Sequence, residues 1–191
     1  TVLVQAEAAA PAKADVQMLK ARLQEAAGDN AAALATLQLL KQQFPEMAEV
    51  PKRMAKLYQK SGQTDLAAKT RLEAAELDHS DREMQEEAAR DAEAKRDVAR
   101  MIAVYERLVR LDPEELRYRR LIAKAYDGAG LSRKAALAYQ EIVNRNPEDA
   151  ATRRRMGVLY SELPGFQSRA VLYLKQTLEK NPRDAEMLRR L

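Results

Sequence analysis

The sequence has no cysteine, a single histidine (His79), and only 6 glycines, 7 prolines and 5% aromatic residues. The lack of cysteine excludes disulfides, thiolate nucleophiles and cysteine-ligated metal sites. One histidine excludes a multi-histidine metal site, and no glycine-rich phosphate loop is present. No apolar run is long enough to span a membrane. We therefore expect no enzymatic activity, no cofactor, no metal and no membrane-spanning segment.

The residues that are abundant favour helices. The chain has 191 residues, 46% of them hydrophobic and 32% charged, and Ala, Leu, Glu, Lys, Arg and Gln dominate. These are strong helix formers, whereas β-branched and aromatic residues are sparse and rarely alternate with polar ones. The composition therefore predicts an all-α protein. Residues 1–13 (TVLVQAEAAAPAK) show no clear amphipathic period. We expect them to be an N-terminal linker or a frayed segment, and a chain that begins at Thr1 is expected to be processed or excised from a longer one.

A period of 34 residues runs through the chain. Several residue types keep it, with one extra residue in the last repeat, and they include prolines, small residues and tyrosines. The positions are Pro45, Pro113, Pro147 and Pro182; Ala21, Ala55, Ala89, Ala123 and Gly157; Gly28, Gly62, Gly130 and Gly165; Tyr58, Tyr126 and Tyr160. A fixed period of this length is the signature of a solenoid built from repeated units.

Each repeat is predicted to contain two helices. Residues 116–127 place apolar side chains at helical spacing, and the stretch Gly128-Ala129-Gly130 supplies residues that end a helix. Residues 132–144 form a second amphipathic stretch, which Asn146-Pro147 ends. Two helices can approach closely only where small side chains face each other. The recurrent Ala and Gly positions are therefore expected to lie where the helices of a pair touch.

This pattern of A-x-x-Y, then Gly, then Ala, then N-P or D-P resembles the tetratricopeptide repeat. The resemblance implies a right-handed superhelical solenoid of antiparallel helix pairs. The expected repeats are 14–47, 48–81, 82–115, 116–149 and 150–184, followed by residues 185–191 as the start of a truncated sixth or capping helix. Repeat 82–115 departs most from the pattern, with Ala92, Arg96 and Met101 in place of Tyr, Gly and Ala. Its first helix is expected to run on or to pack loosely.

The resemblance also implies a binding surface. In this family the first helix of each repeat lines a concave groove, and the second, fifth, ninth and twelfth places of the repeat face the ligand. The basic residues at these places are the candidate partner-binding residues: Lys52, Lys56, Arg117, Arg120, Lys124 and Arg154. The acidic residues Glu83, Glu86 and Glu93 occupy such places in the repeat between them. The asparagines of the carboxylate clamp known in chaperone-binding members are missing, so that specialised function is not expected.

Charge is distributed unevenly along the chain. Residues 14–115 contain 16 basic and 20 acidic side chains, whereas residues 116–191 contain 16 basic and 8 acidic ones. A basic C-terminal half favours an acidic partner, and the planar guanidinium of arginine suits carboxylate and phosphate contacts. The alternative is a nucleic-acid-binding helical repeat that uses this basic half. Tyr118 is the only aromatic residue within either arginine run, which disfavours base stacking.

These observations lead to one hypothesis about function. We expect a non-catalytic protein–protein interaction scaffold that binds a protein or peptide with acidic segments in its concave groove. Such repeats serve in bacterial complexes, including exopolysaccharide secretion and pilus or cytochrome assembly, and the periplasm or a membrane-attached location is favoured over the cytoplasm. Met187, Leu188 and Leu191 are apolar positions at the C-terminal end. A homo-oligomer formed through this end is a further expectation.

Overall fold

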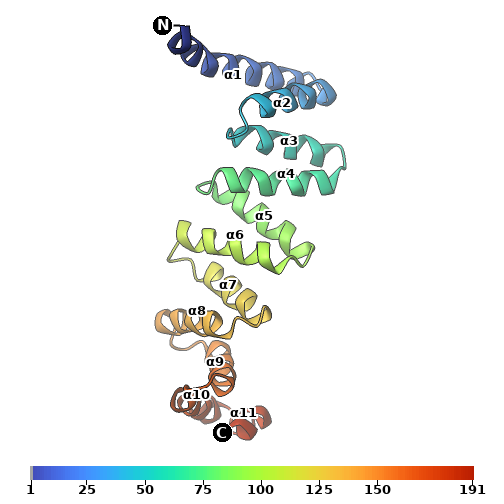
Figure 1. Ribbon diagram of the computed structural model, residues 1–191. Helices are drawn as coiled ribbons and strands as arrows, with labels where there is room; N and C mark the ends of the chain where they lie inside the picture. Colours follow the sequence, from blue (N-terminus) through green and yellow to red (C-terminus); the bar gives the residue numbers. More distant parts are fainter. Residues whose placement is uncertain (1) are drawn as a thin grey trace. The chain divides into compact units, whose positions relative to one another are not determined.

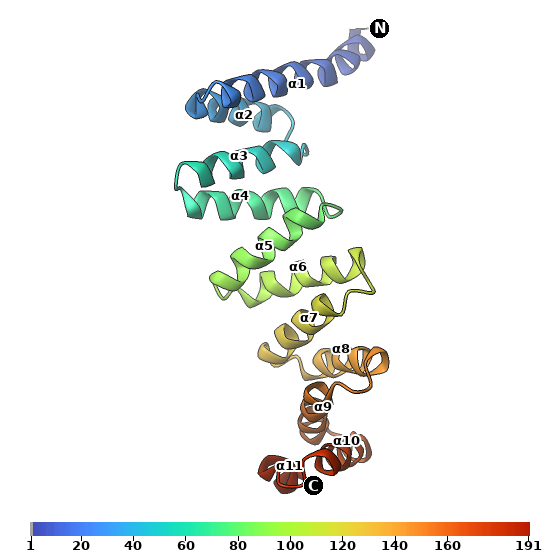
Figure 2. The same ribbon diagram turned by 180° about the vertical axis from the view of Figure 1, so that it is seen from behind.

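The computed structural model describes the backbone of residues 2–191 and the side chains of residues 13–191. Within this range the chain forms eleven α-helices and no strand (Figure 1; Figure 2 shows the opposite side). It divides into two compact units, an N-terminal unit of residues 1–91 and a C-terminal unit of residues 92–191. The all-α fold of consecutive helix pairs is confirmed. The expected linker, residues 1–13, lies almost wholly outside the residues whose side chains are described.

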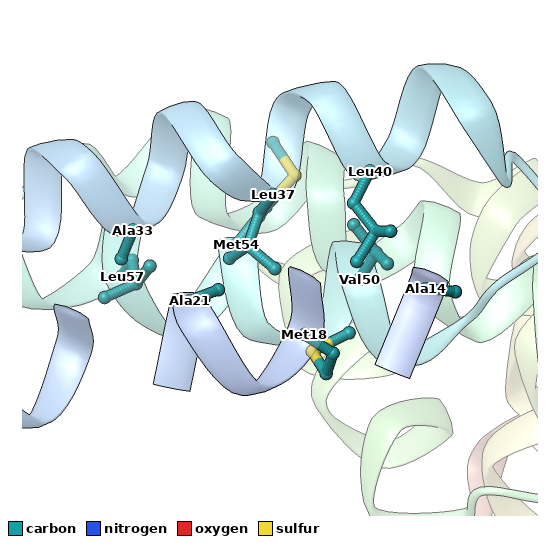
Figure 3. Close-up of a cluster of buried hydrophobic side chains, with 9 residues drawn as sticks. All are labelled: Ala14, Met18, Ala21, Ala33, Leu37, Leu40, Val50, Met54 and Leu57. Carbon is teal, nitrogen blue, oxygen red and sulfur yellow. The ribbon is translucent and has the colours of Figure 1, made fainter. Parts of the chain in front are cut away.

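The N-terminal unit holds two helix pairs and most of a fifth helix. Its helices are α1 (Val2–Ala26), α2 (Asn30–Gln43), α3 (Glu49–Lys60), α4 (Thr64–Leu77) and α5 (Arg82–Ala94). Its core begins where three helices meet, and Figure 3 shows side chains of α1 and α2 directed toward those of α3. The members of this cluster are Ala14, Met18, Ala21, Ala33, Leu37, Leu40, Val50, Met54 and Leu57. The first repeat therefore completes its core with the first helix of the next repeat, as a solenoid requires.

The C-terminal unit continues the pattern. Its helices after α5 are α6 (Val98–Leu111), α7 (Leu116–Gly128), α8 (Ser132–Arg145), α9 (Ala150–Glu162), α10 (Gln167–Lys180) and α11 (Ala185–Arg190). Helix α7 packs on both α6 and α8, and α9 packs on both α8 and α10. The largest fully buried side chains of this unit are Tyr105, Leu108, Ile142, Met156, Leu159, Leu174 and Met187.

The small residues lie where the helices of a pair touch. Ala55 and Ala123 are fully or almost fully buried, with exposed fractions of 1% and 0%. At Gly157, which holds the same place in the last repeat, an added Cβ would lie only 3.1 Å from Cδ2 of Leu174 on α10. Helices α9 and α10 thus approach closely at this position, and the burial of Ala55 and Ala123 is consistent with the same constraint in their repeats.

The turns between paired helices use left-handed backbone. Gly130 has φ of +71°, and the three equivalent glycines have similar positive values, whereas Gly128 belongs to α7. In the repeat without a glycine, Arg96 takes the same conformation with φ of +53°. Helix α5 accordingly ends at Ala94. Of the two alternatives for this helix, the one in which it runs on was wrong, because Arg96 accepts the left-handed conformation at an energetic cost. The alternative that the helix packs loosely stays a prediction.

Candidate protein-binding surface

The six candidate binding residues lie on first helices of the repeats. Lys52 and Lys56 lie on α3 in the N-terminal unit. Arg117, Arg120 and Lys124 lie on α7 in the C-terminal unit, where their spacing places them on one face of the helix. The sixth, Arg154, lies on α9 of the same unit. The two groups therefore belong to different units.

Three of the six form ion pairs with the aspartate that ends their own repeat, directly before the next first helix. Lys52 Nζ lies 2.5 Å from Oδ2 of Asp81, and Arg120 Nη2 lies 2.9 Å from Oδ2 of Asp149. Arg154 continues the series with Nε 2.8 Å from Oδ2 of Asp184, and it also binds Glu186 at 2.6 Å. The sequence separations are 29, 29 and 30 residues. The fifth place of a repeat is therefore tied to the aspartate that precedes the following first helix.

The same aspartates cap those helices. Oδ1 of Asp149 accepts a hydrogen bond from the backbone N–H of Thr152 at 3.0 Å, and Asp81 and Asp184 accept equivalent bonds at the starts of α5 and α11. Side-chain capping satisfies N–H groups that have no partner within the helix. For Asp184 the hydrogen bond from Arg154 lowers the pKa of the carboxyl below its ordinary value. Each aspartate thus remains ionised, caps the N-terminus of a helix and forms an ion pair with a basic side chain.

A second link joins α7 to α9. Arg155 donates from Nε and Nη2 to the two carboxylate oxygens of Asp127, at the twelfth place of the preceding repeat. The hydroxyl of Tyr139 lies 3.4 Å from the same carboxylate, and burial together with this negative charge raises the pKa of Tyr139 to about 12. The pairs Arg120–Asp149 and Arg155–Asp127 together link the first helices α7 and α9 through their side chains. Arg120 and Arg154 therefore lie on first helices that are joined by ion pairs.

Two lysines differ from these paired cations. Lys56 and Lys124 are exposed, and within residues 13–191 neither forms an ion pair or a side-chain hydrogen bond. Arg117 is also exposed, and its guanidinium lies 4.8 Å from the ring centre of Tyr118, to whose hydroxyl it donates a hydrogen bond. Arg120 and Arg154 each keep 42% of the side chain exposed despite their ion pairs. Arg117, Arg120, Lys124 and Arg154 are here called the basic face, and the side chain of each is at least partly exposed.

The sequence-based reasoning missed the aspartate partners. Each of these aspartates is the residue directly before a first helix: Asp81, Asp149 and Asp184. A basic residue followed by an aspartate 29 or 30 positions later was a detectable signal. Repeat 82–115 lacks this signal, because it has Glu86 at the basic position and Glu115 29 residues later at the aspartate position. Periodicity alone identified the face but not the interactions across it.

The C-terminal end carries a partly covered apolar group. Met187 is fully buried, whereas Leu188 and Leu191 are 54% and 52% exposed. The expected homo-oligomer through this end stays a prediction. Among the described residues, none of the helices combines the length and apolarity needed to cross a lipid bilayer.

Comparison with known proteins agrees with this architecture. The family model described as tetratricopeptide repeat matches residues 15–46. No curated protein matches the sequence. A crystal structure of MamA protein is similar with a TM-score of 0.50 and 21% sequence identity, covering 91% of this chain and 94% of that one. YrrB, described as a TPR protein with an unusual peptide-binding site, is similar with a TM-score of 0.52 and 14% identity, covering 91% and 89%.

A larger protein contains the same arrangement. A chain in the structure of Naa15/Naa10 bound to HypK-THB is similar with a TM-score of 0.63 and 18% identity, covering 93% of this chain and 30% of that one. The succession of helix pairs, each packed on the next, defines a helical-repeat protein. Residues 15–46 are a tetratricopeptide repeat, and the chain as a whole has the fold of tetratricopeptide-repeat proteins.

Proposed function

We propose that this protein is a non-catalytic scaffold whose basic face binds an acidic segment of another polypeptide. The observation that carries the proposal is Lys124, an exposed cation on α7 with no carboxylate partner among the described side chains. It lies on the same face as Arg120, whose ion pair with Asp149 engages only one of the two terminal nitrogens. An arginine has five N–H donors in a planar fork, so further donors of Arg120 remain for a ligand carboxylate.

The chemistry of the partner follows from charge. The C-terminal stretch of residues 116–191 carries 16 basic and 8 acidic side chains, so its field attracts acidic chains. Contacts between exposed charges are individually weak, and they contribute to association rate and specificity more than to affinity. YrrB, which is similar in fold, is described as having a peptide-binding site. A bacterial envelope role and a periplasmic or membrane-attached location belong to the same proposal.

The ion pairs determine which substitution tests this proposal. Replacing Arg120 or Arg154 by Glu would place a second acid beside Asp149 or Asp184 and would also weaken the link between repeats. Lys124→Glu avoids this, since Lys124 forms no such pair. Lys175→Glu is the matched control, because Lys175 is an exposed lysine on the second helix α10. Both substitutions change the net charge equally.

The measurement is fluorescence polarisation with a labelled peptide of alternating Glu and Ser, which contains no aromatic residue. The unmodified protein should bind it with an affinity that falls steeply as salt is raised through about 0.15 M. Lys124→Glu should weaken binding about tenfold, whereas Lys175→Glu should change it less than about twofold. Equal losses for the two variants would overturn the basic face as the site. Tighter binding of a single-stranded RNA than of the peptide would favour the nucleic-acid alternative instead.

A further inference from the structure

An open pocket lies on the second-helix side of the C-terminal unit, apart from the basic face. It lies between α6 and α8, with α7 at its base, and has a volume of about 280 Å³. Its lining is mainly apolar and consists of Val109, Ile122, Tyr126, Leu137 and Ala138, together with Arg119, Lys134 and Glu141. Pockets for whole small ligands usually measure about 300–1,000 Å³. The smaller size suits one large side chain of a partner.

The next repeat shows what fits this space. Ala138 on α8 corresponds to Tyr173 on α10, after the one-residue insertion. The ring of Tyr173 stacks on Tyr160 of α9 with centres 5.7 Å apart, and its hydroxyl donates to Oε1 of Gln140 on α8 at 2.9 Å. Tyr173 therefore spans the three helices that correspond to the lining of the pocket one repeat earlier. The pocket is open because Ala138 provides no ring there.

The base of the pocket matches the surface on which Tyr173 stacks. Tyr126 corresponds to Tyr160, and a cation lies over each ring: Lys134 Nζ is 5.3 Å from the centre of Tyr126, and the guanidinium of Arg169 is 5.9 Å from that of Tyr160. In the last repeat this arrangement holds an aromatic side chain of the chain itself. In repeat 116–149 the same arrangement holds none.

We propose that this pocket binds an aromatic side chain from an acidic segment of a partner polypeptide, stacked on Tyr126. The rim supplies the charge preference, since Lys134 is exposed and makes no ion pair with any described carboxylate, while Glu141 is neutralised by Arg119. A second copy offers no fully exposed ring among its described residues. The seven tyrosines and two phenylalanines all lie within residues 13–191, and each is buried or half-buried.

The test compares two labelled pentapeptides with equal charge, one with Phe and one with Ala between pairs of Glu residues. The unmodified protein should bind the Phe peptide about fivefold more tightly, as expected for one aromatic contact. Ala138→Tyr should fill the pocket as Tyr173 does in the next repeat and should remove this difference. Ala31→Tyr, at an exposed alanine of α2, is the matched control and should preserve it.

This experiment separates the pocket from the basic face. Lys124→Glu should weaken binding of the Ala peptide, which has only the basic face to bind, whereas Ala138→Tyr should weaken binding of the Phe peptide alone. Equal affinities of the two peptides for the unmodified protein would overturn the proposal, as would an unchanged ratio in folded Ala138→Tyr. A Leu peptide that binds as tightly as the Phe peptide would overturn the stacking on Tyr126.

A second measurement does not depend on the variant. Methyl NMR of Ala138, Leu137 and Ile122 in the unmodified protein should show upfield shifts on addition of the Phe peptide, because an aromatic ring would lie over these groups. The Ala peptide should leave them unshifted. Shifts confined to methyl groups outside the pocket would place the ring elsewhere and overturn the proposal.

Discussion

Arg71 on α4 binds both carboxylate oxygens of Asp91 on α5, with Nε 2.6 Å from Oδ2 and Nη2 2.8 Å from Oδ1. Its third nitrogen, Nη1, donates to Oε1 of Gln59 on α3 at 2.9 Å. Only 12% of the Arg71 side chain is exposed. One guanidinium therefore joins three consecutive helices of the N-terminal unit, and parallel paired hydrogen bonds of this kind are among the stronger polar contacts in proteins.

Removing this guanidinium should lower stability. Arg71→Ala is expected to reduce the free energy of unfolding by about 2 kcal/mol, because it leaves the partly buried carboxylate of Asp91 without its partner. Urea unfolding followed by circular dichroism measures the change. The control is Arg90→Ala, at an exposed arginine beside Asp91 on α5. It should lower the free energy of unfolding by about 0.5 kcal/mol or less. Similar losses for the two variants would contradict this role of Arg71.

The left-handed turn at Arg96 offers a stabilising substitution. Arg96→Gly should raise the free energy of unfolding by about 1 kcal/mol, because glycine adopts φ of +53° without the steric penalty of a side chain. The reverse change, Gly130→Arg, should destabilise by a similar amount, since Gly130 has φ of +71°. Urea unfolding of the two variants measures whether the free energy of unfolding rises or falls. A lower free energy of unfolding for Arg96→Gly would contradict the prediction.

The closely packed alanines should not tolerate larger side chains. Ala55→Leu and Ala123→Leu should each destabilise the fold by about 1–3 kcal/mol, because the paired helices leave no room for the added carbons. Ala103→Leu on α6 is the control, as Ala103 is exposed. Thermal unfolding should show lower midpoints for the first two variants and a nearly unchanged one for the control.

Helix α5 should exchange its backbone amide protons faster than α7. Its buried side chains are mostly alanines, with Met84 as the large apolar one, and Oε1 of the fully buried Gln85 has no hydrogen-bond donor. Helix α7 instead buries Tyr118, Ile122 and Tyr126. Local opening is easier where less apolar surface is buried. Hydrogen exchange followed by mass spectrometry tests this, and equal protection of both helices would contradict it.

The capping aspartates should make stability sensitive to acid. Burial raises the pKa of Asp149, but the hydrogen bonds from Thr152 and Arg120 outweigh it and leave this pKa below its ordinary value. The unfolded state then binds more protons near pH 4, so the stabilisation is present above about pH 4 and is lost as the pH falls further. Asp149→Asn should flatten this part of the pH profile of urea unfolding. Asp15→Asn, at an exposed residue, should leave the profile unchanged.

Much of the fold was predictable because one period constrains many residues at once. The buried alanines Ala55 and Ala123 and the turn at Gly130 stand at places that a 34-residue period specifies. The turn at Arg96 was not predictable, since a side chain disfavours the conformation that its neighbours impose.

The candidate surface was predictable only in part. Periodicity placed Arg120 and Lys124 on one face, but it gave no information on whether a carboxylate at the start of the next first helix lies within reach. Arg120 has such a carboxylate within reach and Lys124 has none among the described side chains, and only the distances between side chains show this difference. The pocket beside Tyr126 arises from Ala138, which is an ordinary helical residue until it is compared with Tyr173.

The double role of Asp149 affects how such repeats can be recombined. This residue ends repeat 116–149, so it travels with its partner Arg120, while the helix that it caps belongs to the next repeat. A chimaeric array would therefore keep this ion pair whatever repeat follows, but it would keep the pair Arg155–Asp127 only where the upstream repeat supplies the Asp and the downstream repeat supplies the Arg. Exchange of repeats between such arrays is therefore governed by a two-residue compatibility rule that can be read from sequence.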